Sequence, residues 1–112
     1  MSTKLTKALK PVTDEATDDA KSALLGLIGD AKASTSSFVQ STAVELEEWI
    51  VAASKGELSE DEFKALVDAQ TIVAKSFVLR QSQIAQQKAE KLTVNMLELA
   101  VTKILPVLIA AI

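Results

Sequence analysis

The stretch KGELSEDEF, residues 55–63, contains the end of one helix and the beginning of the next, and the fold follows from it. Ser59 and Glu62 have the spacing of a capping box. In this motif the serine hydroxyl accepts a hydrogen bond from a free backbone N–H of the first turn, and the glutamate accepts one from the serine N–H. Leu58 before the cap and Phe63 after it have the spacing of a hydrophobic staple. We therefore expect a helix to begin at Ser59.

The residues just before this cap carry the opposite signal. Lys55 places a cation in the last turn of a preceding helix, and Gly56 follows in the position where a left-handed residue commonly ends a helix. Only residues 56–58 separate this end from the new beginning. Because such a short connection leaves two helices side by side, the sequence predicts an antiparallel reversal at 56–58.

The apolar spacing on both sides of the turn predicts an all-α chain folded as a long antiparallel helical hairpin. One helix from Ser59 to Leu105 would be about 70 Å long, and a helical first half from Thr13 to Ser54 about 63 Å, at a rise of about 1.5 Å per residue. The hairpin has two helices, or three if the first half breaks near Gly29, and the sequence leaves open whether the helix continues through Gly26. The expected heptad-like seam of the long helix consists of Phe63, Leu66, Val73, Phe77 and Ile84, widened by Val67, Ala74, Val78 and Ala85.

The predicted domain organisation is a basic N-terminal arm (1–12), a helical hairpin domain (13–105) and an apolar C-terminal tail (106–112). Pro106 should kink or break the helix, because proline lacks a backbone N–H and crowds the preceding turn. A two-helix hairpin cannot surround its own core. We therefore expect it to complete a bundle by oligomerisation.

The composition argues against catalysis. The chain has no cysteine and no histidine, which removes thiolate nucleophiles, soft metal sites and the commonest general base. Its net charge of −3 argues against a nucleic-acid partner. The acidic cluster near the expected helix start is interpreted as a set of dipole partners instead of a cation site; it consists of Asp14, Glu15, Asp18 and Asp19. We predict no catalytic residue, no cofactor and no metal.

The predicted function is that of a non-catalytic structural or adaptor protein that acts through helix–helix association, as a homo-oligomer or with a helical protein partner. The segment 92–112 has more apolar positions than one neighbouring helix can cover, and soluble monomers rarely expose a large apolar patch. The expected interface residues are Trp49, Ile50, Leu97, Val101, Ile104, Leu105, Leu108 and Ile112.

The alternative hypothesis is a membrane-active amphipathic helical protein that binds an interface or forms a pore. Lysines at every third position would form a basic stripe on an N-terminal helix. In a simple hairpin this stripe and the apolar tail lie at the same end, far from the turn at 56–58, and together they would bind an anionic surface. The expected membrane contacts are Lys4, Lys7, Lys10, Leu108, Ile109 and Ile112.

The expected location is the cytoplasm, with peripheral membrane association under the alternative hypothesis. The N-terminal lysines could imitate a basic leader, but Pro11 and an acidic cluster follow where an apolar segment should be. The absence of cysteine fits a reducing compartment. The features of the chain are common to helical hairpins in general, and none is specific to one family.

Overall fold

In the computed structural model, which describes residues 3–12 and 15–111, every regular element is a helix. The all-α prediction is confirmed for this part of the chain. The elements in chain order are α1 (Thr3–Leu9), α2 (Glu15–Lys32), α3 (Ser37–Ser54), α4 (Glu60–Leu79), α5 (Gln83–Glu90), η1 (Lys91–Asn95), α6 (Met96–Leu99), η2 (Ala100–Ile104) and α7 (Leu105–Ala111).

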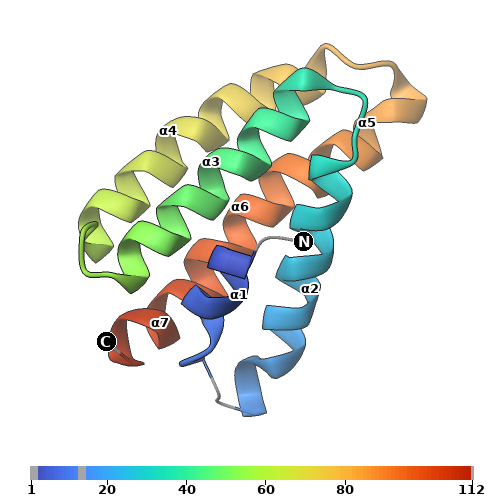
Figure 1. Ribbon diagram of the computed structural model, residues 1–112. Coiled ribbons are helices and arrows are strands. Elements are labelled where there is room, and N and C mark those ends of the chain that lie inside the picture. The colour runs from blue at the N-terminus through green and yellow to red at the C-terminus, as the bar shows by residue number, and fades with distance from the viewer. Residues whose placement is uncertain (1–2, 13–14, 112) are drawn as a thin grey trace.

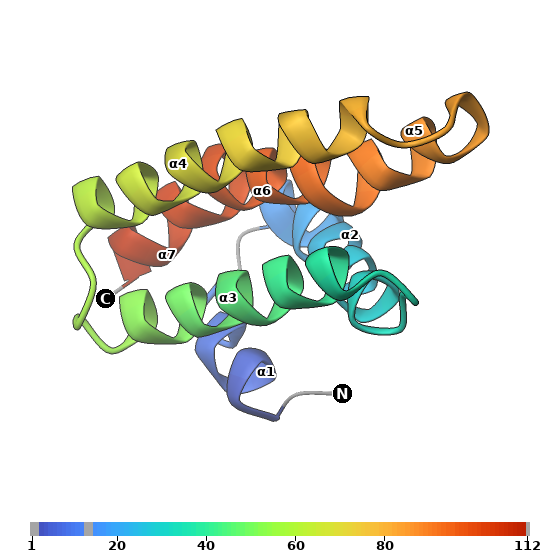
Figure 2. The same ribbon diagram turned by 90° about the horizontal axis from the view of Figure 1, so that it is seen from above.

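The C-terminal helix lies in the middle of the bundle. The segments from α5 to α7 follow one another without a break as a single helix, Gln83–Ala111, in which η1 and η2 are wide π-helical turns. Helices α2 and α4 both contact η1, α6 and η2, while α3 contacts η1 and α7. Figures 1 and 2 show α2, α3 and α4 arranged around this helix, with α1 packed against α3. The most apolar segment of the chain therefore packs against three other helices.

The prediction of one helix from Ser59 to Leu105 is wrong, because the chain reverses a second time at residues 80–82. Helix α4 ends at Leu79, and Ser82 caps the next helix by accepting a hydrogen bond from the Ala85 N–H at 3.3 Å. The bundle measures 41 × 24 × 23 Å, well short of the length expected for the hairpin. The second reversal lets the C-terminal helix pack against α2, α3 and α4 of its own chain.

The second reversal also changes which segments meet. Helix α7 contacts α3, and Figure 1 shows the C-terminus at the same end of the bundle as the turn at 56–58. The expectation that the C-terminal segment lies far from this turn is therefore wrong. It assumed one reversal, whereas two reversals bring the chain back to the end from which α4 starts.

The first half of the chain bends at a serine and threonine run instead of at Gly29. Helix α2 continues through both Gly26 and Gly29 and ends at Lys32. Residues 33–36 form the connection, and Ser36 caps α3 by accepting a hydrogen bond from the Val39 N–H at 3.4 Å. Serine and threonine compete with the helix for backbone hydrogen bonds, which makes this run a better place to end a helix than a single glycine.

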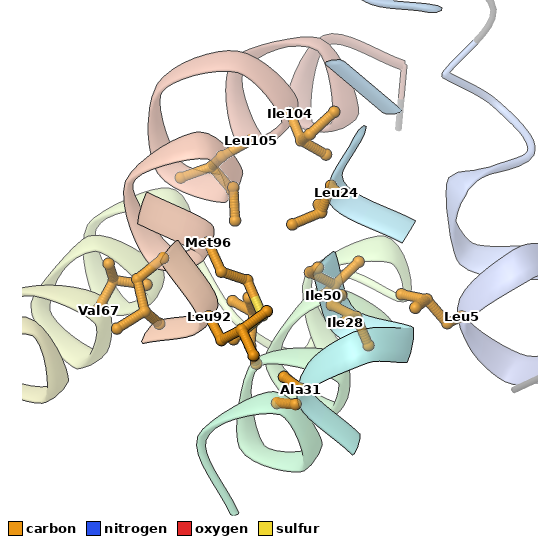
Figure 3. Close-up of a cluster of buried hydrophobic side chains, with 14 of the residues drawn as sticks. Leu5, Leu24, Ile28, Ala31, Ile50, Val67, Leu92, Met96, Ile104 and Leu105 are labelled. Carbon is orange, nitrogen blue, oxygen red and sulfur yellow. The ribbon is translucent and has the colours of Figure 1, made fainter. Parts of the chain in front are cut away.

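The core is built where α2, α3, α4 and the C-terminal helix meet (Figure 3). Leu24 of α2, Ile50 of α3 and Met96 of α6 are each 1% exposed or less. The buried face of α4 differs from the expected seam. Leu66 and Val73 of that seam are exposed, whereas Val67, Ala74 and Val78, which were expected beside the seam, are buried. The buried residues of α4 are Phe63, Val67, Ala74 and Val78. Helix α4 packs against two neighbours, α3 and the C-terminal helix, so its core face is rotated from a simple two-helix seam.

Of the kink or break predicted at Pro106, the break does not occur within the described residues, because the C-terminal segment stays helical through this proline. The π turn η2 ends at Ile104, two residues before this proline, and the Leu105 N–H donates to the Ala100 carbonyl five residues back. Wide turns of this kind relax the regular spacing of the helix next to a residue that cannot donate. Leu105 and Leu108 are buried, so α7 packs on the bundle.

Candidate functional site

The turn at 56–58 and its cap have a structural role. Gly56 has a φ of +75°, the left-handed conformation expected at a helix end. The Ser59 Oγ accepts a hydrogen bond from the Glu62 N–H at 3.1 Å, and the Glu62 carboxylate accepts one from the Ser59 N–H at 2.9 Å, which completes the capping box. The backbone N–H and the side chain of Ser59 both lower the pKa of Glu62. Phe63 is buried and Leu58 packs against the same core.

Most of the expected interface residues lie inside one copy of the chain. Trp49 and Val101 are half-buried, and Ile112 lies outside the described residues. The second reversal is the reason, because it places the C-terminal helix between α2, α3 and α4. The expected interface residues that are 1% exposed or less are Ile50, Leu97, Ile104, Leu105 and Leu108.

The expected membrane contacts divide between surface and core. The lysines of the N-terminal segment, Lys4, Lys7 and Lys10, are exposed, whereas Leu108 is buried and Ile109 is half-buried. The apolar tail therefore faces the bundle in this conformation. The helix Gln83–Ala111 is long and apolar enough to cross a membrane by length and composition, a property that the core helix of a soluble bundle can share.

Two contacts fix how α3 and α4 lie against each other. The rings of Phe38 and Phe77 stack with their centroids 4.4 Å apart and an interplanar angle of 26°. The Gln70 Nε2 donates to the Thr42 Oγ1 at 3.0 Å, and this hydroxyl donates to the Phe38 carbonyl at 2.9 Å. Both contacts cross from one helix to the other, so the register of the pair is set by a ring stack and a polar bridge.

An apolar strip remains open along this pair of helices. Leu66 and Val73 precede and follow Gln70 by four and three residues, which places them on its face of α4, and they are 37% and 47% exposed. Trp49 follows Thr42 by seven residues on α3 and is half-buried. We call this surface the α3–α4 seam, and it consists of Phe38, Trp49, Leu66, Val73 and Phe77.

A concave surface lies between α1, α2 and α3. It is an open groove of about 410 Å³, and an ion pair stands at its edge, with the Lys32 Nζ 3.2 Å from a Glu47 carboxylate oxygen. The groove is apolar apart from this pair. Its lining residues are Leu5, Leu25, Gly26, Ile28, Gly29, Lys32 and Glu47.

The described residues do not form a metal-binding cluster. Within residues 3–12 and 15–111, no three His, Cys, Asp or Glu side chains are placed to hold one ion. Asp18 and Asp19 of the acidic cluster are exposed, Asp14 lies outside the described residues, and the side chain of Glu15 is not described.

A feature that the sequence reading missed lies at the corner between α4 and α5. We call residues 79–84 the α4–α5 corner; Leu79 and Ile84 stand at its two ends and are 77% and 95% exposed. The sequence analysis placed Ile84 in the apolar seam of one long helix. The available signal was the charge pattern, since no acidic residue occurs between Asp68 and Glu90.

Comparison of the chain with protein families, with curated proteins and with solved structures found no match.

Proposed function

We propose that the protein is a non-catalytic structural or adaptor protein that acts through helix–helix association, and that a second copy of the chain packs on the α3–α4 seam. The observation that supports this proposal is the open apolar strip at this seam. The buried side chains of the C-terminal segment pack inside one copy, whereas Leu66 and Val73 remain 37% and 47% exposed. The chain offers no histidine or cysteine for catalysis at this surface.

The shape of the seam suits a second helical pair. Two antiparallel helices that present apolar residues at three- and four-residue intervals can be closed by the same surface of a twofold-related copy, which gives a four-helix arrangement. Trp49 supplies a large aromatic side chain, the kind that dominates binding energy at interfaces. The Phe38–Phe77 stack and the Gln70–Thr42 hydrogen bond hold the seam in one conformation before binding. Such preorganisation lowers the entropy cost of association.

The test is the molar mass of the protein in solution, measured by light scattering coupled to size exclusion. The wild type should have the mass of a dimer or a larger oligomer. Leu66→Glu and Val73→Glu each place a charge in the seam and should shift the mass toward that of one chain. Ile72→Glu is the matched control, because Ile72 is 71% exposed on the same helix but lies on a different face from Val73.

Two results would contradict the proposal. One is a wild-type protein that has the mass of a single chain throughout the concentration range. The other is an oligomer that loses mass equally in the Ile72→Glu control. This would show that a charge on another face of α4 has the same effect as a charge in the seam. Circular dichroism of each variant verifies that the helices remain folded.

A second candidate function is membrane insertion, which the helix Gln83–Ala111 favours by its length and apolar composition. This helix would have to leave the core first, because Leu97 and Leu108 are buried there. Weakening the core with Leu97→Ala should then increase dye leakage from anionic vesicles. Absence of leakage with both the wild type and the variant would exclude insertion under those conditions.

A further inference from the structure

The α4–α5 corner projects from one end of the bundle. In Figure 2 the turn between α4 and α5 extends beyond the adjoining ends of α2 and α3. It carries the two large apolar side chains with the highest exposure among the described residues, Ile84 at 95% and Leu79 at 77%. Exposed apolar side chains on a projecting turn are available to a flat surface as well as to a concave one.

Along the chain, the charged residues on both sides of the corner are all basic over residues 69–89. Residues 69–89 contain Lys75, Arg80 and Lys88 and no aspartate or glutamate, although acidic residues outnumber basic ones in the whole chain. All three cationic side chains are exposed. The remaining polar residues of the corner are glutamine and serine. Two apolar side chains therefore stand in a local surplus of positive charge on a protein of net charge −3.

The corner is held by polar contacts that do not involve its apolar side chains. The Gln81 Nε2 donates to the Phe77 carbonyl at 3.1 Å, and the Gln86 Nε2 donates to the Gln81 carbonyl at 3.3 Å. The Ser82 Oγ accepts from the Ala85 N–H at 3.3 Å. The turn is thus already formed, and its apolar side chains contribute little to folding because they remain in water.

We propose that the α4–α5 corner docks the folded protein on an anionic membrane surface. Leu79 and Ile84 enter the interfacial region, while Arg80 and the neighbouring lysines contact the lipid phosphates. Apolar burial and attraction to anionic lipid add together at such a surface. Two aliphatic side chains offer far less area than the roughly 1,200 Å² of a stable protein interface, which favours a lipid surface as the partner. This docking goes beyond helix association, uses a different surface, and requires no helix to leave the core.

The test is co-sedimentation of the full chain with vesicles of phosphatidylcholine alone or with phosphatidylserine added. Binding should require phosphatidylserine and should weaken as salt is raised. Ile84→Gln and Arg80→Glu should each weaken partitioning by about tenfold, from the loss of aliphatic burial and the reversal of one charge near the surface. The matched controls are Val44→Gln, at an exposed position on α3, and Lys64→Glu, about 24 Å along α4 from Arg80 at about 1.5 Å per residue. Both should bind like the wild type.

Four results would overturn the proposal. The first is no binding to phosphatidylserine vesicles at low salt, and the second is equal binding to neutral vesicles. The third is binding that the controls weaken as much as Ile84→Gln and Arg80→Glu do. Because these positions lie outside the α3–α4 seam, the mass measurement on the same variants separates the two proposals. A change in oligomer mass without a change in vesicle binding would assign the corner to a protein contact and reject the membrane.

Discussion

Replacing glycine by alanine should stabilise the protein at two of its three glycines and destabilise it at the third. Gly26 and Gly29 lie inside α2, and a Cβ atom added at either position would meet nothing within 4 Å. Glycine in a helix interior is less favourable than alanine by about 0.5–1 kcal/mol, because it loses more backbone entropy on folding. We therefore expect Gly26→Ala and Gly29→Ala together to raise the free energy of unfolding by about 1–2 kcal/mol, with the two effects adding.

Gly56 should respond in the opposite direction. A Cβ atom there would also meet nothing within 4 Å, but the residue has a φ of +75°. The left-handed conformation brings the Cβ of an L-residue close to its own backbone, at a cost of about 1–2 kcal/mol. Gly56→Ala should therefore lower the free energy of unfolding by this amount, although the space around the side chain is just as open.

The assay is urea denaturation followed by circular dichroism, with a thermal melt as a second measurement. Each kcal/mol should shift the melting temperature by about 4 °C for a chain of this size. The slope of the unfolding free energy against urea concentration should stay unchanged if only stability differs. Destabilisation by the double alanine variant of α2 would refute the reasoning, because it would show that this face of the helix is in close contact with another surface.

Three further outcomes are expected. Ser59→Ala should lower the free energy of unfolding by about 1 kcal/mol by removing the cap hydroxyl, and an unchanged urea midpoint would contradict this role. The pKa of Glu62 is below its ordinary value of 4.5, so its stabilising contribution is present above that pH and is lost as the pH falls through the lower folded value. Acid titration of Glu62→Gln should accordingly show a smaller loss of stability than the wild type, and equal losses would argue against the contribution. Leu97→Ala removes a side chain that is 0% exposed and should cost about 2–5 kcal/mol in urea denaturation, whereas a cost below about 1 kcal/mol would mean that the C-terminal helix is not the centre of the core.

The signals that the sequence carried reliably were local ones. The capping box of Ser59 and Glu62 and the glycine at position 56 act within a few residues, so their effect does not depend on the rest of the fold. The same local reading missed the reversal at Ser82, because Ala85 stands where a capping box needs glutamate or glutamine. Glutamine and lysine on both sides also favour helix, so no strong local signal marked the break.

The surfaces open to partners were decided by the tertiary structure. Trp49 is half-buried, whereas Leu97 and Leu108 became core residues once the chain reversed at 80–82. Ile84 moved in the other direction, from an expected seam to 95% exposure. The amino-acid sequence by itself determined that the chain is helical and where one turn lies, because capping and helix propensity are properties of neighbouring residues. Which apolar residues are covered was decided only by the packing of α2, α3 and α4 around the C-terminal helix, because burial depends on contacts between segments far apart in the chain.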